Sequence, residues 1–217
     1  MAGKFILTLL ERFLIFWSFM EINRNLSLSR HLHLTRSHVL AQVFWIVVFA
    51  IMTAIGARIE IPHQPVPFTL QTFFVLLAGA FLGVRNGVLS QFLYLIMGAA
   101  GLPVFTIGGM GLAKLLGPTG GYLLSFPVAA FVVGTMIHTI RKSKGSMDFP
   151  WVLFSMFIGL LVVFSVGTLQ LYLVSVRNLG EAFRMGFLIF SWWDLMKLFA
   201  AATIYHRFSR RYKTFPP

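Results

Sequence analysis

The chain has 217 residues, of which 58% are hydrophobic and only 11% are charged. Soluble domains carry about 25% charged residues, so this composition excludes an ordinary soluble domain and indicates a polytopic helical membrane protein. The formal net charge of +12 lies in short basic clusters between apolar segments, a distribution that excludes a nucleic-acid-binding stripe. The absence of cysteine excludes disulfides, thiolate zinc sites and cysteine-ligated iron–sulfur clusters.

Residues 1–38 are predicted to form a cytoplasmic or interfacial N-terminal extension. Residues 1–22 contain an apolar run that Glu11 and Arg12 interrupt, so the run is too short to span a bilayer. The run also lacks the small-residue cleavage site of a signal peptide. We expect an amphipathic helix at the membrane surface, unless the natural start lies at Met20. A polar, basic linker follows.

From residue 39 to residue 207, apolar segments alternate with short polar connections. Six segments are interpreted as membrane helices: 39–57, 68–83, 86–100, 122–138, 149–176 and 185–207. At 1.5 Å per residue the second and third are about 22–25 Å long, short of a hydrocarbon core of roughly 30 Å. A basic tail, residues 208–217, completes the chain. The sequence therefore predicts an all-α transmembrane domain of six helices.

Two irregular stretches interrupt this pattern. Residues 58–67 contain Pro62, Pro65 and Pro67, which favour a rigid, extended loop. Residues 101–121 are rich in glycine but lack the lysine and Ser/Thr pattern of a phosphate-binding loop. Irregular backbone is tolerated in a membrane protein where it is buried in protein or lines a cavity. We interpret the second stretch as a lid over a site.

The basic residues predict the orientation in the membrane. With both termini inside, thirteen of the 18 Lys and Arg residues lie on the cytoplasmic side, and Arg58, Lys114, Arg177 and Arg184 lie outside. This asymmetry predicts a multi-pass protein of the cell (inner) membrane with both termini cytoplasmic. The proline loop and the glycine-rich lid then face outward together.

Two opposite charges lie near the middle of the last apolar segment. Asp194 and Lys197 are three residues apart, so a helix places them on one face. An unpaired charge at mid-bilayer costs roughly 2.5–3.5 kcal/mol, and intramembrane charges usually serve a function. The pair is either a structural ion pair between helices or the floor of a polar ligand site that opens to the outside.

Smaller polar and apolar signals occur earlier in the chain. Ala50 and Ala54 form a small-xxx-small pair, which allows another backbone to approach closely. The pair packs either inside the bundle or against a partner subunit. Gln71 and Gln91 are polar positions in short helices, where each either bonds to a neighbouring helix or serves the site; Gln71 lies beside the proline loop.

The ordered motifs PVPFTLQT (65–72), GLPVF (101–105) and LGPTGGY (116–122), with Asp-x-x-Lys in the last helix, resemble the BioY family. These proteins are the biotin-specific S components of energy-coupling factor (ECF) transporters. The resemblance covers about residues 40–207. It implies a six-helix membrane protein that captures biotin from outside, and a transmembrane T component with two cytoplasmic ATPases that complete transport. The extension to Ser37 and the pair Thr106-Ile107 depart from the family pattern.

The resemblance also implies a set of ligand contacts. Biotin has a ureido group with two N–H donors and a carbonyl, an apolar bicyclic body and a carboxylate tail. Asp194 and Gln71 can accept from the N–H groups, and Lys197 can meet either the carbonyl or the carboxylate. Thr69 lies in the matched motif. The aromatic rings of Trp193 and Tyr122 either pack on the ring system of biotin or contact lipid and the protein core.

The predicted function is a substrate-binding membrane subunit for biotin uptake, without catalytic activity and without a cofactor or metal. The sequence contains no Walker A motif and no HExxH motif. Two other classes stay open at this point: a proton-coupled or facilitative carrier, and an intramembrane enzyme with Asp194 as acid or base.

Overall fold

A computed structural model describes residues 33–106, 109–144, 147–188 and 192–211. The chain divides into two compact units, Met1–Leu40 and Ala41–Pro217. Helix α2 (His33–Arg58) begins in the first unit and continues into the second. The amphipathic helix expected in residues 1–22 lies outside the described residues, and the three-part division of the chain stays a prediction.

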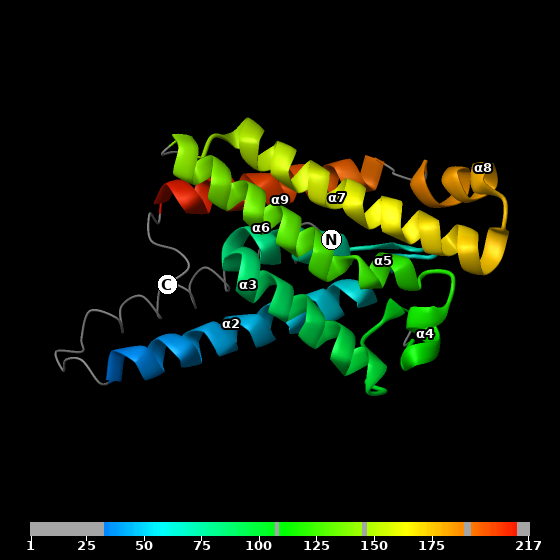
Figure 1. Ribbon diagram of the computed structural model, residues 1–217, viewed down its shortest axis with the longest axis horizontal. Helices are drawn as coiled ribbons and strands as arrows, with labels where there is room; N and C mark the ends of the chain where they lie inside the picture. Colours follow the sequence, from blue (N-terminus) through cyan, green and yellow to red (C-terminus); the bar gives the residue numbers. More distant parts are fainter. Residues whose placement is uncertain (1–32, 107–108, 145–146, 189–191, 212–217) are drawn as a thin grey trace, which may run out of the picture. The chain divides into compact units, whose positions relative to one another are not determined.

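The second unit is built from long apolar helices. Helix α6 (Phe126–Lys144) packs against α3 (Gln71–Ala99) and α7 (Phe149–Leu171), and α9 (Trp192–Arg211) packs against α7 and α3 (Figure 1). Shorter elements complete the unit: β1 (Glu60–Ile61), β2 (Phe68–Thr69), α4 (Leu112–Leu116), α5 (Gly120–Leu124), the π-turn Tyr172–Val176, α8 (Leu179–Ala182) and the π-turn Phe183–Phe187. The predicted all-α membrane architecture is confirmed.

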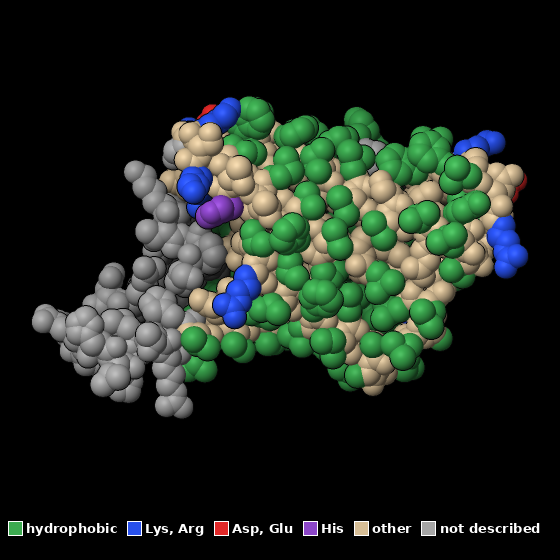
Figure 2. Space-filling model, in the orientation of Figure 1, with side chains coloured by type: hydrophobic (Ala, Val, Ile, Leu, Met, Phe, Trp, Pro, Cys, Tyr) green, Lys and Arg blue, Asp and Glu red, His purple; other side chains and the backbone are tan. Residues whose placement is uncertain are grey.

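Four described helices are long and apolar enough to cross a membrane: 39–58, 71–99, 120–144 and 149–176. A fifth is added if the bent pair Leu179–Phe187 and Trp192–Arg210 is counted as one span. Figure 2 shows hydrophobic side chains spread over the middle of one face, with Lys and Arg mainly toward its two ends. A helix bundle of this kind suits a hydrocarbon environment, in which helices satisfy their own backbone groups.

Helix α3 contains the second and third predicted helices. Gly83 interrupts it with φ 73° and ψ −168°, a conformation that L side chains rarely adopt. A Cβ added to Gly87 would lie 3.0 Å from the carbonyl oxygen of Ala78, so the two halves fold back on each other. The count of six predicted segments is therefore consistent with the four or five candidate spans.

The last helix was predicted wrongly as one continuous segment over 185–207. The structure has a bend of 50° between Leu179–Phe187 and Trp192–Arg210, which places Asp194 in the first turn of α9 and not near mid-helix. The hydroxyl of Tyr122 donates to the carbonyl oxygen of Gly186 at 3.0 Å. Gly186 belongs to the π-helical segment Phe183–Phe187, so this bond connects α5 to the part of the chain that precedes the bend.

The proline loop agrees with the extended backbone expected for it, whereas the connection after the fourth predicted helix differs. The proline loop closes with a short antiparallel pair of β1 and β2, in which Glu60 is opposite Thr69 and Ile61 is opposite Phe68. The fourth helix was predicted to end at residue 138, but α6 continues to Lys144. Lys and Arg in the last turn of a helix interact favourably with the helix dipole, which supports this extension.

Candidate ligand site

One cavity collects most of the polar residues that the sequence singled out. Its volume is about 60 Å³, several times what one water needs. Its walls come from five parts of the second unit: the proline loop with β2, the start of α3, the loop before α4, α5 with the start of α6, and the facing sides of α7 and α9. The lining residues are Val66, Pro67, Phe68, Thr69, Gln71, Thr72, Thr106, Thr119, Tyr122, Leu123, Phe126, Val163, Phe164, Asp194 and Lys197.

An ion pair from α9 forms part of the cavity wall. Lys197 Nζ lies 2.6 Å from Asp194 Oδ1, and their side chains are only 12% and 4% exposed. Asp194 is in the first turn of α9, where the helix dipole favours a carboxylate. The helix thus carries both charges into the cavity, as their three-residue spacing predicted.

Lys197 also joins α9 to the corner between β2 and α3. Its ammonium group donates to the carbonyl oxygen of Thr69 at 2.8 Å and to the hydroxyl of Thr72 at 3.1 Å. Together with Asp194, these acceptors use the three protons of the lysine. A ligand oxygen can therefore bond to Lys197 only if it replaces one of these three acceptors. The same bonds hold Asp194 and Thr69 in position.

The amide of Gln71 lies at the same corner. Its Oε1 accepts from the Thr69 hydroxyl at 3.0 Å, and its Nε2 donates to the hydroxyl of Tyr94. The hydroxyl oxygen of Thr69 in turn accepts from the backbone N–H of Gln71 at 3.3 Å. Gln71 is only 2% exposed, so these bonds are needed to offset the loss of hydration.

Aromatic and aliphatic side chains make the rest of the wall. Tyr122 lines the cavity while its hydroxyl is engaged with the carbonyl oxygen of Gly186, and its ring packs edge-to-face against Phe164 at 6.2 Å. Phe126 and Val163 extend this apolar surface. The cavity therefore offers a charged and amide-bearing part next to an apolar part.

The structure brings five of the six predicted ligand residues together: Asp194, Lys197, Gln71, Thr69 and Tyr122. Trp193 is 53% exposed and does not line the cavity. Adjacent residues of a helix point in different directions, and here Asp194 is the one that faces the cavity. Sequence reasoning did not select Thr72, Thr106 or Thr119. Thr72 belongs to the motif PVPFTLQT and Thr119 to the motif LGPTGGY. These two motifs therefore contained further residues of the cavity wall.

The two predicted partner-contact residues differ in burial. Ala50 is fully buried within the second unit, so it has no surface to offer another subunit in this conformation, whereas Ala54 is partly exposed. The burial of Ala50 agrees with the first of the two alternatives, packing inside the bundle. A contact between this helix and a partner stays a prediction.

Gln91 is fully buried, and its Nε2 donates to the hydroxyl of Thr53 on α2 at 3.3 Å. Of the two alternatives for Gln91, this is the bond to a neighbouring helix.

Comparison with known proteins yields consistent matches. The model of the BioY family matches residues 26–214. The chain is 41% identical over 157 residues to the biotin transporter BioY of Thermotoga maritima, covering 72% of this chain and 89% of that protein. It is 38% identical over 166 residues to a probable biotin transporter BioY of Pyrococcus horikoshii, covering 76% and 94%.

A solved structure agrees with these relatives. The S-component for biotin from an ECF-type ABC transporter has a TM-score of 0.72 and 27% sequence identity to this chain. The similarity covers 80% of this chain and 93% of that one. The shared fold therefore includes nearly all of the solved protein.

Proposed function

The chain belongs to the BioY family, and on this premise we propose that it is the substrate-binding membrane subunit, or S component, of a biotin uptake system. Its matched relatives are transporters, so we assign it no catalytic reaction. Biotin is then the transported ligand.

The observation that carries this proposal is the composition of the cavity wall. Asp194 and the Gln71 carbonyl oxygen are acceptors for the two ureido N–H groups of biotin, and the neighbouring Thr69 adds a hydroxyl. Tyr122 and the other aromatic residues match the apolar bicyclic body. We propose that Lys197 holds Asp194 and exchanges one of its own bonds for a ligand oxygen. Trp193 is left out of this set, because its side chain lies outside the cavity.

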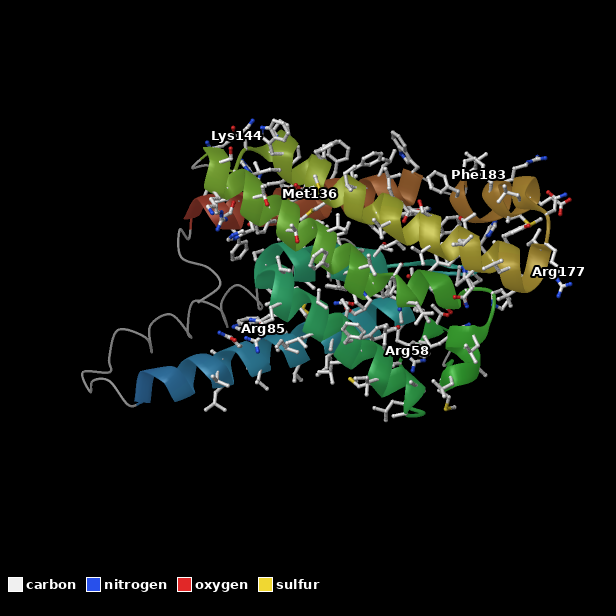
Figure 3. The ribbon with its side chains drawn as sticks, viewed as in Figure 1. Arg58, Arg85, Met136, Lys144, Arg177 and Phe183 are labelled. Atoms are coloured by element: carbon white, nitrogen blue, oxygen red, sulfur yellow. The ribbon has the colours of Figure 1, made fainter. Side chains whose placement is uncertain are left out.

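The charges support an orientation with both termini in the cytoplasm. Figure 3 shows Arg85 and Lys144 toward one end of the molecule and Arg58 and Arg177 toward the other. The first pair belongs to the side that carries most of the Lys and Arg residues in the sequence. In this orientation the cavity receives biotin from outside the inner membrane. Because the solved relative comes from an ECF-type ABC transporter, we propose that a T component and two cytoplasmic ATPases supply the energy.

Ligand binding by the purified chain tests the proposal. In detergent or nanodiscs, calorimetric titration with biotin should give saturable binding near one ligand per chain, and the ligand should be recovered chemically unchanged. Absence of binding would contradict the proposed function. Recovery of altered biotin would instead indicate an enzyme.

A further inference from the structure

The hydroxyl of Tyr94 connects the cavity to the glycine-rich stretch after α3. Tyr94 is fully buried and is not one of the cavity residues. Its oxygen accepts from Gln71 Nε2 and donates to the backbone carbonyl oxygen of Val104 at 3.4 Å. The ring packs edge-to-face with Phe105 at 5.5 Å and stacks on Phe126, a cavity residue, at 6.2 Å. Tyr94 thus lies directly behind the cavity wall and contacts both the wall and the glycine-rich stretch.

The chemistry of the acceptor determines the direction of these hydrogen bonds. A backbone carbonyl can only accept, so Tyr94 uses its one proton for Val104 and can then only accept from Gln71. Gln71 must therefore turn its NH₂ group toward Tyr94 and its carbonyl toward Thr69, which donates to that carbonyl. The guanidinium group of Arg58 donates to the neighbouring Pro103 carbonyl and secures the same stretch.

We propose that Tyr94 is a positioning residue that sets ligand specificity by fixing the orientation of the Gln71 amide. The fixed amide presents an acceptor on the side of Thr69, so the site selects a ligand with an N–H donor there. This inference rests on the proposed function, because the donor is a ureido N–H of biotin. An amide turned the other way would place N–H against N–H and leave buried donors unpaired, which is unfavourable.

The test compares Tyr94→Phe with wild type for three ligands: biotin and its two ring N-methyl derivatives, each of which lacks one N–H. The variant keeps the ring and its packing but frees the amide. Biotin affinity should fall about three- to tenfold, the effect of one hydrogen bond. The affinity for the derivative that lacks the N–H facing Gln71 should fall less than the affinity for biotin. The ratio of the two affinities should therefore be smaller in Tyr94→Phe than in wild type.

Tyr205→Phe is the matched control. Tyr205 is also buried, its hydroxyl accepts from Arg141 Nη2 at 3.1 Å, and it does not line the cavity. This variant should keep the wild-type ratio of affinities for biotin and its two N-methyl derivatives. If Tyr94→Phe weakens all three ligands by the same factor, or weakens none, the specificity role is wrong. A purely structural role would lower the melting temperature and every affinity together.

A measurement without ligand separates this inference from the proposed function. The side-chain NH₂ signals of Gln71, assigned in ¹⁵N-labelled protein by their loss in Gln71→Leu, should shift in Tyr94→Phe and stay in Tyr205→Phe. Unshifted signals in Tyr94→Phe would overturn the role of Tyr94 even if biotin binds. Failure of the wild-type chain to bind biotin would overturn the proposed function and with it the ureido donor as the selected group.

Discussion

The Lys197 ammonium group has three protons, and the described structure gives each of them an acceptor, in Asp194, Thr69 and Thr72. At this scale the ion pair is part of a small network that joins α9 to the β2–α3 corner. Loss of the lysine would remove three bonds and leave the Asp194 carboxylate, which is 3% exposed, without its counter-charge. Loss of the aspartate charge would leave Lys197 with two neutral acceptors. The two residues should therefore respond unequally to substitution.

The first prediction concerns Asp194→Asn and Lys197→Met. Breaking a buried ion pair typically costs about 3–5 kcal/mol, because one charge is stranded, and we expect Lys197→Met to lower the melting temperature more than Asp194→Asn. If the cost falls on the complex, biotin affinity should drop by about a hundredfold or more. Titration and thermal unfolding, measured on the same samples, separate binding from folding.

The double variant Asp194→Asn/Lys197→Met is the control, because neither charge is then stranded. Its stability should recover relative to Lys197→Met, while biotin affinity should stay low. A stable double variant with wild-type affinity would mean that the pair is purely structural and that it does not recognise the ligand.

Glycine contacts decide how the helices of the second unit approach one another. The hairpin within α3 turns at Gly83, and Gly134 on α6 lies against this turn. A Cβ at Gly134 would be 2.8 Å from the Val84 nitrogen and 2.9 Å from the Gly83 carbonyl carbon. Such distances are too short for real Cβ contacts, and backbone cannot move aside as a flexible side chain can. Small residues are common where membrane helices pack this closely.

The second prediction is that Gly134→Ala destabilises the bundle. Overpacking of a close contact costs typically about 1–3 kcal/mol, so the melting temperature in detergent should fall by several degrees. Gly180→Ala is the control, because a Cβ there would make an ordinary contact of 3.5 Å with Asn178 Oδ1. Equal melting temperatures for the two variants would show that α6 and the hairpin can separate without cost.

For the whole molecule, the distribution of charge predicts the orientation, and the chain suits a clean test because it has no cysteine. Ser143 near the end of α6 and Ser175 near the end of α7 are both exposed, and each is close in size to cysteine. The positive-inside rule assigns Ser143 to the cytoplasm, since Arg141, Lys142 and Lys144 surround it. Ser175 belongs to the opposite end.

The third prediction is that a membrane-impermeant thiol reagent labels Ser175→Cys in intact cells and labels Ser143→Cys only after the cells are opened. The wild-type chain should stay unlabelled in both conditions. Labelling of Ser143→Cys from outside would reverse the orientation and would place the mouth of the cavity on the wrong side for uptake.

The amino-acid sequence predicted most of the apolar helices and five of the side chains that line the candidate cavity. Those features are local: apolar length defines a span, and the spacing of Asp194 and Lys197 places both on one helix face. Matched motifs added Thr69, Gln71 and Tyr122, and the structure brings all five into one cavity.

Features that depend on contacts between residues far apart in the chain could not be predicted from local patterns. The last apolar segment is bent by 50°, and Tyr122 bonds to Gly186 in its first part, 64 positions away in the sequence. No pattern in the sequence distinguishes Tyr94 from other tyrosines in apolar segments. Its role depends on its hydrogen bonds to Gln71 and Val104. The position of Trp193 outside the cavity has a related reason: hydropathy does not distinguish a side chain that faces lipid from one that faces the protein interior, because both environments are apolar.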